Sequence, residues 1–294
     1  MKHLFSCLLA GIIFIGLTSF AGDKPAYRVF DQKGRHADYS DILKAASEAD
    51  IILFGELHNN PVCHWMEIEL TKDLYEVKKE NLVLGAEMFE ADNQLLLNEY
   101  TSKFIRKKDF EAEAKLWKNY QTDYAPLVDF AREKGIRFVG TNIPRRFAAI
   151  VSRKGFSGLD SINGLQRALI APLPIKYDST MKCYASIGKS APEAMHGSLQ
   201  LGKAQAIKDA TMAHFILKNW EAGKTVLHFN GAYHSDNFEG LTWYVNAYGK
   251  RYPYFPKVVT ISCVEQDQTE DLSAENTGKA DFIICIPASM TKTY

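Results

Sequence analysis

Two copies of the pattern G-x-x-H hold the side chains with the clearest potential for chemistry in this sequence. The first covers residues 55–58 and ends in His58, and the second covers residues 231–234 and ends in His234. Each follows an apolar run of strand length. We therefore expect the glycine to let the backbone turn tightly and the imidazole to project over the edge of a sheet. A lone histidine at such a place is more often structural, but the repetition indicates a shared site.

Charged side chains follow the other apolar runs. Glu56 lies inside the first G-x-x-H pattern, Glu87 follows the second run, and Arg145 and Arg146 follow the third. Each has an ordinary explanation, since a glutamate can sit at a helix N-terminus and two arginines can form a solvated turn. Polar groups at the ends of four runs together predict a functional pocket, because buried strand ends are otherwise apolar.

An aromatic cluster covers residues 117–126. Tyr120 and Tyr124 follow Trp117 at near-helical spacing, and Pro126 fits the first turn of the helix expected after it. Core packing at a helix entrance explains these residues as well as ligand contact does. A tyrosine phenolate can also ligate haem iron, which gives the two tyrosines a specific hypothesis.

Continuous apolar runs alternate with helix-period segments, which predicts strands covered on both faces of a mostly parallel sheet. The expected strands cover residues 51–54, 82–86, 136–140, 226–229, 258–262 and 282–286, and the expected helices cover 63–77, 92–104, 124–134 and 204–220. Asp92 is the expected N-cap of the second helix. This order of elements predicts an α/β fold, in which ligands bind beyond the carboxyl ends of the strands.

The stretch between the third and fourth expected strands contains prolines among helical fragments and no convincing strand. We predict an α/β sheet domain, with helices flanking the sheet, formed by residues 22–146 and 221–294. Residues 147–220 are expected to form a smaller, mostly helical subdomain inserted into it.

Residues 1–21 have the pattern of a signal peptide, with Lys2 before an apolar stretch and small residues at a cleavage position. A lipid anchor is not expected, because Cys7 lies before most of the apolar stretch. The mature protein is therefore expected to be exported, to the periplasm in a Gram-negative source.

The composition narrows the class of partner. The 35 Lys and Arg residues balance 35 Asp and Glu residues over 294 positions, which argues against nucleic acid as a partner. Five cysteines without a C-x-x-C pattern do not make a disulfide scaffold, and their pairing cannot be deduced from spacing.

Taken in order, several of these segments resemble the ChaN-like haem-binding family of bacterial iron-regulated proteins. The matching segments are residues 54–60 (FGELHNN), 87–89 (EMF), 124–126 (YAP), 142–145 (NIPR), 205–206 and 208–213, and 230–234 (NGAYH). The resemblance covers about residues 45–264. It implies an α/β domain with a smaller helical domain, haem as the cofactor, a tyrosine as iron ligand, and a homodimer that stacks two haems face to face.

The resemblance also implies roles for individual residues. By motif position Tyr124 is the first choice for the iron ligand and Tyr120 the second. His58, and with less support His234, would assist the haem site. Arg145 and Arg146 would pair with the propionates, because a guanidinium matches carboxylate geometry. An outer-membrane haem receptor or transport components would be the partners in uptake.

More distantly, the sequence is similar to the erythromycin esterases and the TIKI metalloproteases, which carry paired G-x-x-H motifs. This similarity supports an alternative function as a hydrolase. His58 or His234 would then be a general base, or both would bind a divalent metal with Glu56 or Glu87. The sequence contains neither G-x-S-x-G nor H-E-x-x-H, so serine-hydrolase and zincin mechanisms of the usual kind are excluded.

Overall fold

The protein is described by a computed structural model that covers residues 24–187 and 200–294. The predicted signal peptide lies outside these residues. No helix in the two described ranges is both long enough and apolar enough to cross a membrane.

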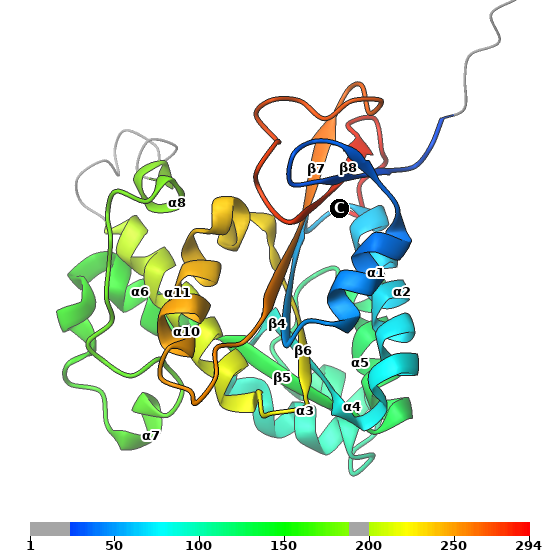
Figure 1. Cartoon of the computed structure of the whole chain (residues 1–294). Coiled ribbons are helices and arrows are strands. Elements are labelled where there is room, and N and C mark those ends of the chain that lie inside the picture. The colour runs from blue at the N-terminus through cyan, green and yellow to red at the C-terminus, as the bar shows by residue number, and fades with distance from the viewer. Residues whose placement is uncertain (1–23, 188–199) are drawn as a thin grey trace, which may run out of the picture.

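One mixed sheet of eight strands forms the centre of the molecule, in the order β2-β1-β8-β7-β3-β6-β4-β5 (Figure 1). The strands are β1 Arg28–Asp31, β2 His36–Ala37, β3 Ile51–Glu56, β4 Leu82–Glu90, β5 Arg137–Asn142, β6 Thr225–Gly231, β7 Val258–Gln266 and β8 Phe282–Pro287. The six strands from β3 to β8 run parallel, whereas β1 and β2 add an antiparallel edge. The carboxyl ends of these six strands therefore lie along the same edge of the sheet.

Helices cover both faces of the sheet. They are α1 Tyr39–Ser47, α2 Pro61–Lys78, α3 Gln94–Thr101, α4 Lys107–Glu113, α5 Ala125–Lys134, α6 Arg145–Lys154, α7 Gly164–Arg167, α8 Lys182–Ala185, α10 Leu201–Asn219 and α11 Gly240–Gly249. Figure 1 shows α1, α2 and α5 on one side of the sheet and α10 and α11 on the other.

Strand β3 shows why its sequence is a continuous apolar run. Ile52 and Phe54 pack into the core under α1, α2 and α5, whereas Ile51 and Leu53 pack into the core under α10 and α11. Because successive side chains of a strand point to opposite faces, a strand that is covered twice needs apolar residues at every position.

The six predicted strands and the α/β fold class are confirmed. The short antiparallel strands β1 and β2 and the helices α1, α4 and α11 were not predicted. The prediction that Asp92 is an N-cap is wrong. Asp92 lies inside a short 3₁₀ turn, Ala91–Asn93, and the N-cap of α3 is Asn93. Pro126 does lie in the first turn of α5.

The described part of the segment expected to form an inserted subdomain contains helices and no strand, and residues 168–180 between α7 and α8 are irregular. Its longest helix, α10, packs directly on the sheet and forms part of the main core. The boundaries of a separate subdomain stay a prediction. Cys63, Cys183, Cys263 and Cys285 are all buried as free thiols.

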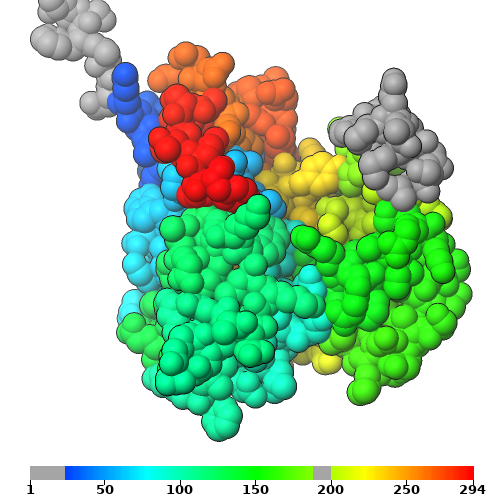
Figure 2. All heavy atoms as spheres, turned by 180° about the vertical axis from the view of Figure 1, so that it is seen from behind, coloured from blue at the N-terminus to red at the C-terminus, as the bar shows by residue number. Residues whose placement is uncertain are grey.

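The C-terminal residues return to the carboxyl edge of the sheet. Figure 2 shows them in red, resting on green residues of the α5 side. The Thr293 hydroxyl donates to Asp123 Oδ2 at 3.0 Å, and the Thr293 amide donates to the Asn59 carbonyl at 2.9 Å.

Candidate functional site

The two G-x-x-H patterns lie side by side at the carboxyl edge of the sheet. The parallel register of β3 and β6 places Gly55 opposite Asn230 and Glu56 opposite Gly231. Each glycine then faces the other pattern at close range. A Cβ on Gly55 would lie 2.8 Å from the Ala232 Cα, and a Cβ on Gly231 would lie 2.7 Å from His58 Nε2.

This close approach corrects the expected role of the glycines. Neither Gly55 nor Gly231 has a positive φ, so a tight turn is not the reason for glycine at these positions. Glycine is needed because any side chain there would collide with the neighbouring motif.

His58 sits at the boundary between the core and the solvent. Its Nδ1 lies 2.5 Å from Glu56 Oε1, its ring packs edge-on against Trp117 at 4.9 Å, and its side chain is 35% exposed. Burial lowers the pKa of His58, but the hydrogen bond with Glu56 and the charge of Glu87 outweigh it and raise the pKa above the usual value. The carboxylate therefore fixes the ring through Nδ1, and Nε2 lies on the side of Gly231.

His234 lies deeper and is held on both sides by carboxylates. Its Nε2 is 3.0 Å from Glu87 Oε1, and its Nδ1 contacts Asp209, which comes from α10. Burial lowers the pKa of His234, but the charges of Glu87 and Asp209 raise it to about 10. At neutral pH this side chain is an imidazolium with both nitrogens engaged, which prevents it from accepting a proton.

Glu87 completes this ion pair. Burial raises its pKa, but the positive His234 and the amide of Gly231, which donates to Glu87 Oε2 at 2.8 Å, lower it to about 2. This hydrogen bond connects the backbone of the second G-x-x-H pattern to the end of β4.

A groove opens above these residues. Its first hollow, of about 390 Å³, is lined by His58, Glu87, Glu90, Trp117, Asn142, Ile143, Arg145, Gln205, Lys208, Gly231, Tyr233 and His234. A second hollow of about 490 Å³ shares Glu90, Trp117 and Arg145 with the first, and continues the groove towards Lys115 and Arg146. The two hollows combine a partly buried indole, Trp117, with several cationic side chains.

The cations of the groove differ in how they are engaged. Arg146 and Lys115 both pair with Asp92, at 2.5 and 3.1 Å. Arg145 is exposed, and within the described residues no hydrogen bond or ion pair holds its guanidinium. Arg145 is therefore the cation that is available to an anionic ligand.

The structure places the two predicted tyrosine ligands away from this groove. Tyr120 and Tyr124 lie in a single π-helical turn, Tyr120–Tyr124, and both are buried. The Tyr124 hydroxyl donates to Glu56 Oε1 at 2.7 Å. Burial, helped for Tyr124 by the charge of Glu56, raises the pKa of both phenols far above the usual value. The tyrosine that does line the groove is Tyr233, and it is 42% exposed.

Beneath the groove lies a fully buried cluster of Glu56, His64 and Glu67. Within the described ranges these three residues are the set of His, Cys, Asp and Glu side chains whose ligand atoms converge. Of the residues predicted for a divalent metal, Glu56 belongs to this set, whereas His58, Glu87 and His234 do not. His64 and Glu67 were not predicted; their spacing of three in the helix after β3 was the available signal.

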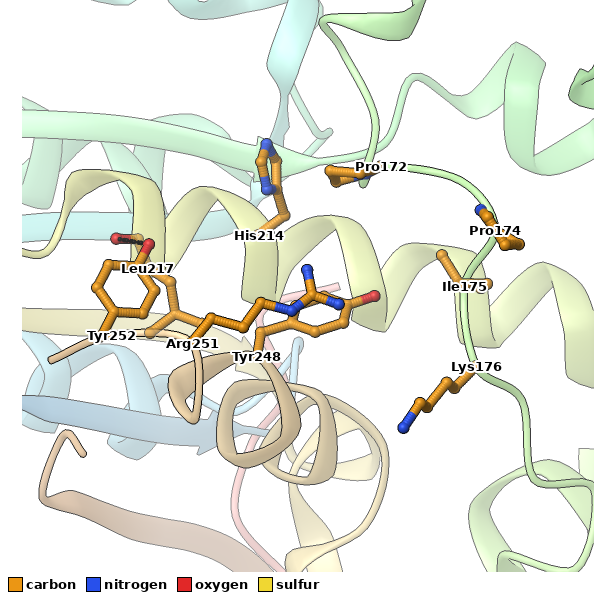
Figure 3. A pocket seen from close by; sticks show the side chains of 9 residues that line it. All are labelled: Pro172, Pro174, Ile175, Lys176, His214, Leu217, Tyr248, Arg251 and Tyr252. Atoms are coloured by element: carbon orange, nitrogen blue, oxygen red, sulfur yellow. Dashed lines mark hydrogen bonds between the residues drawn. The ribbon is translucent and has the colours of Figure 1, made fainter. Parts of the chain in front are cut away.

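A separate cavity of about 310 Å³ lies elsewhere, between α10, α11 and the segment 172–176. Figure 3 shows Arg251 beside Tyr248 and Tyr252, with Lys176 apart from them on the opposite segment; the Arg251 guanidinium is 5.1 Å from the centre of the Tyr248 ring. It contains none of the residues predicted for the site.

Comparison with known proteins identifies the family. Residues 42–245 match the family model described as "Haem-binding uptake, Tiki superfamily, ChaN". Among solved structures, the chain is similar to one whose description is "Cofacial heme binding to ChaN of Campylobacter jejuni". The TM-score is 0.65 and the sequence identity is 17%. The match covers 88% of this chain and 96% of the other. An erythromycin esterase, EreC, in its open conformation has a TM-score of 0.51, 12% identity, and coverage of 91% and 98%. No curated protein matches significantly.

Proposed function

The chain belongs to the ChaN family of haem-binding uptake proteins in the Tiki superfamily, and from this membership we propose that it binds haem in the groove between His58 and Arg145. The observation that carries the proposal is the combination of a fixed, partly exposed imidazole, an indole wall and an unpaired guanidinium in one groove. Haem needs an axial ligand, a flat apolar contact and cations for its propionates, and these residues fit all three needs.

His58 is the proposed axial ligand. Its Nδ1 is held by Glu56, so Nε2 is the nitrogen left for the iron, and the His58 side chain lines the groove. A carboxylate behind a ligating imidazole fixes the ring and raises its basicity. The resemblance implies tyrosine ligation, but the hydroxyls of Tyr124 and Tyr120 are buried, which supports His58 over both.

Arg145 is the proposed propionate partner. It is exposed and unpaired in the described part of the chain, whereas Arg146 is already held by Asp92. When bound, haem would supply its iron for storage, transfer or sensing, while the residues of this chain hold and orient it. Export to the periplasm and a role in haem uptake, with haem received from outer-membrane components, complete the proposal.

The hydrolase alternative is not favoured. His234 is a buried imidazolium between Glu87 and Asp209, so it has no lone pair with which to act as a base. The family match describes haem binding, and the structural likeness to the erythromycin esterase concerns the fold.

Titration of the purified mature protein with hemin, followed by its Soret absorbance, tests the proposed ligand. We expect His58→Ala to abolish the band or shift it strongly, because it removes the axial nitrogen. Tyr124→Phe should leave the band unchanged, because that hydroxyl does not reach the groove. A band that survives His58→Ala but is lost in Tyr124→Phe or Tyr233→Phe would overturn the assignment in favour of a tyrosinate.

The same titration tests the propionate partner. Arg145→Ala should weaken hemin binding roughly 10- to 100-fold, the usual size of a lost hydrogen bond to a charged group. Arg146→Ala is the matched control, and we expect a smaller effect, because Asp92 already neutralises that guanidinium. Equal effects of the two substitutions would contradict the special role of Arg145.

A further inference from the structure

We propose that Glu56, His64 and Glu67 form a buried site for a divalent transition metal, and that Zn²⁺ is the ion that their spacing fits. The site lies below the groove proposed for haem and does not include His58. The proposal does not depend on haem binding.

Local structure brings the three side chains together. Glu56 is the last residue of β3, and His64 and Glu67 lie three residues apart on the same face of α2. Their exposures are 1%, 5% and 0%, so no water of the bulk solvent reaches them. Because the connection between β3 and α2 is short, all three side chains come from one strand and the helix that follows it.

The polar atoms that face the centre of the cluster have no hydrogen-bond partner. Both carboxylate oxygens of Glu67, Oε2 of Glu56 and Nδ1 of His64 are buried and unpartnered in the described structure. Within the described ranges neither glutamate forms an ion pair with a lysine or arginine. In the described structure the group that faces both carboxylates is His64, 3.5 Å from each, so two buried carboxylates share one imidazole and the centre is short of positive charge.

The distances fit a metal better than they fit direct hydrogen bonds. His64 Nδ1 is 3.5 Å from Glu56 Oε2 and 3.5 Å from Glu67 Oε2, which is long for a hydrogen bond. Ligands bound to Zn²⁺ at about 2.1 Å in a tetrahedron lie about 3.4 Å from one another. The three ligand atoms all lie within 4.8 Å of one another, so small rotations of the carboxylates close the set.

The outer contacts of His64 orient it as a ligand. Its Nε2 lies 3.2 Å from the His58 carbonyl oxygen and 3.3 Å from Asp123 Oδ2, so this nitrogen carries a hydrogen and donates outward. The lone pair of Nδ1 then points at the two glutamates. A ligating histidine usually donates its other N–H to a carbonyl or carboxylate in this way.

Charge balance supports the same conclusion. Two carboxylates and a neutral imidazole carry a charge of about −2, which one divalent cation neutralises without any proton. Oxygen and nitrogen donors of this kind suit Zn²⁺ and Mn²⁺, but the tetrahedral spacing favours Zn²⁺. The Tyr124 hydroxyl on Glu56 Oε1 leaves Oε2 as the oxygen available to the metal.

The test uses the full mature chain without haem, unfolded in chelator and refolded with Zn²⁺, with Mn²⁺ or with neither. We expect one Zn²⁺ per chain by elemental analysis and a higher melting temperature in Zn²⁺ than in chelator. Co²⁺ in place of Zn²⁺ should give the intense visible bands of a tetrahedral ion.

Variants locate the ion. Glu67→Gln keeps the volume of the side chain and should weaken Zn²⁺ binding more than about 100-fold, beyond the usual effect of an outer contact. Glu76→Gln changes an exposed glutamate of the same helix and should bind as the wild type does. Wild-type protein that refolds and retains no metal would overturn the proposal, and so would equal binding by folded Glu67→Gln protein. Uptake of Mn²⁺ alone, with octahedral Co²⁺ spectra, would overturn the assignment to Zn²⁺.

Discussion

At the scale of single residues, Glu56 joins the surface to the interior. Its Oε1 lies 2.5 Å from His58 Nδ1 and accepts a hydrogen bond from Tyr124, while its Oε2 faces His64. One carboxylate thus orients the proposed haem ligand and contributes to the proposed metal site. The buried place of Tyr124 follows from the same contact, because the phenol is the donor that Glu56 needs on its inner side.

Gly231 offers a test at the same scale. In Gly231→Ala the new methyl carbon would lie 2.7 Å from His58 Nε2 and 2.9 Å from its Cε1, so the ring must leave its position. We expect a loss of about 1–3 kcal/mol of folding free energy, typical of overpacking, and a weakened Soret band with hemin. Chemical denaturation and hemin titration measure the two effects.

Gly164→Ala is the control for this substitution, because a Cβ there meets nothing within 4 Å. An alanine at position 231 that binds hemin as tightly as the wild type would show that the His58 ring has no fixed role in the groove.

At the scale of elements, the apolar runs specified the parallel strands because both faces of each strand are buried. The short edge strands β1 and β2 lack such a run, which is why the sequence did not reveal them. The gathering of Glu87, His58 and His234 at the carboxyl edge was predictable, because each follows a parallel strand. The sequence did not show that both nitrogens of His234 are engaged. That depends on Asp209 of α10, which reaches His234 Nδ1 from a distant part of the chain.

The aromatic cluster shows a further limit of sequence patterns. Near-helical spacing correctly placed Tyr120 and Tyr124 on one local element, but that element is a π-helical turn that directs both side chains inward. Periodicity reports which residues share a face; it does not report whether the core or a ligand covers that face.

The ion pair of His234 with Glu87 and Asp209 links three elements, β4, α10 and the end of β6, and predicts a pH dependence. The pKa of His234 rises from 6.5 to about 10 on folding, so the folded state holds one more proton between these pH values. The free energy of unfolding should therefore fall as the pH rises through this interval, by up to about 1.4 kcal/mol per pH unit from this group. Denaturation at a series of pH values measures the slope.

His234→Gln should remove this contribution to the slope and destabilise the protein by about 3–5 kcal/mol at neutral pH, because two buried carboxylates lose their cation. His214→Gln, on the same helix α10, is the control. Burial lowers the pKa of His214, the opposite direction from that of His234. An unchanged slope in His234→Gln would show that the ion pair is not charged in the folded protein.

At the scale of the whole molecule, the strand order brings together residues that are far apart in the sequence. β6 lies between β3 and β4, so residues near positions 56, 87 and 231 become neighbours, and the C-terminal Thr293 closes over Asp123. This insertion of a late strand between two early ones cannot be deduced from the order of elements. The resemblance to a known family supplied the haem-binding family, which the order of elements alone does not reveal.

The open groove also predicts the assembly of the holoprotein. Haem held on one side by His58 and Trp117 would leave its opposite face towards solvent. Two copies that stack their haems would bury both apolar faces at once, which is the driving force expected for a symmetric dimer.

Analytical ultracentrifugation should therefore show single chains without hemin and dimers with two haems at saturation. Iron-free protoporphyrin IX should not produce the dimer to the same extent, because it lacks the bond to His58, and His58→Ala should remain single with hemin. A haem-saturated wild-type protein that stays a single chain would contradict the cofacial arrangement while leaving haem binding by one chain intact.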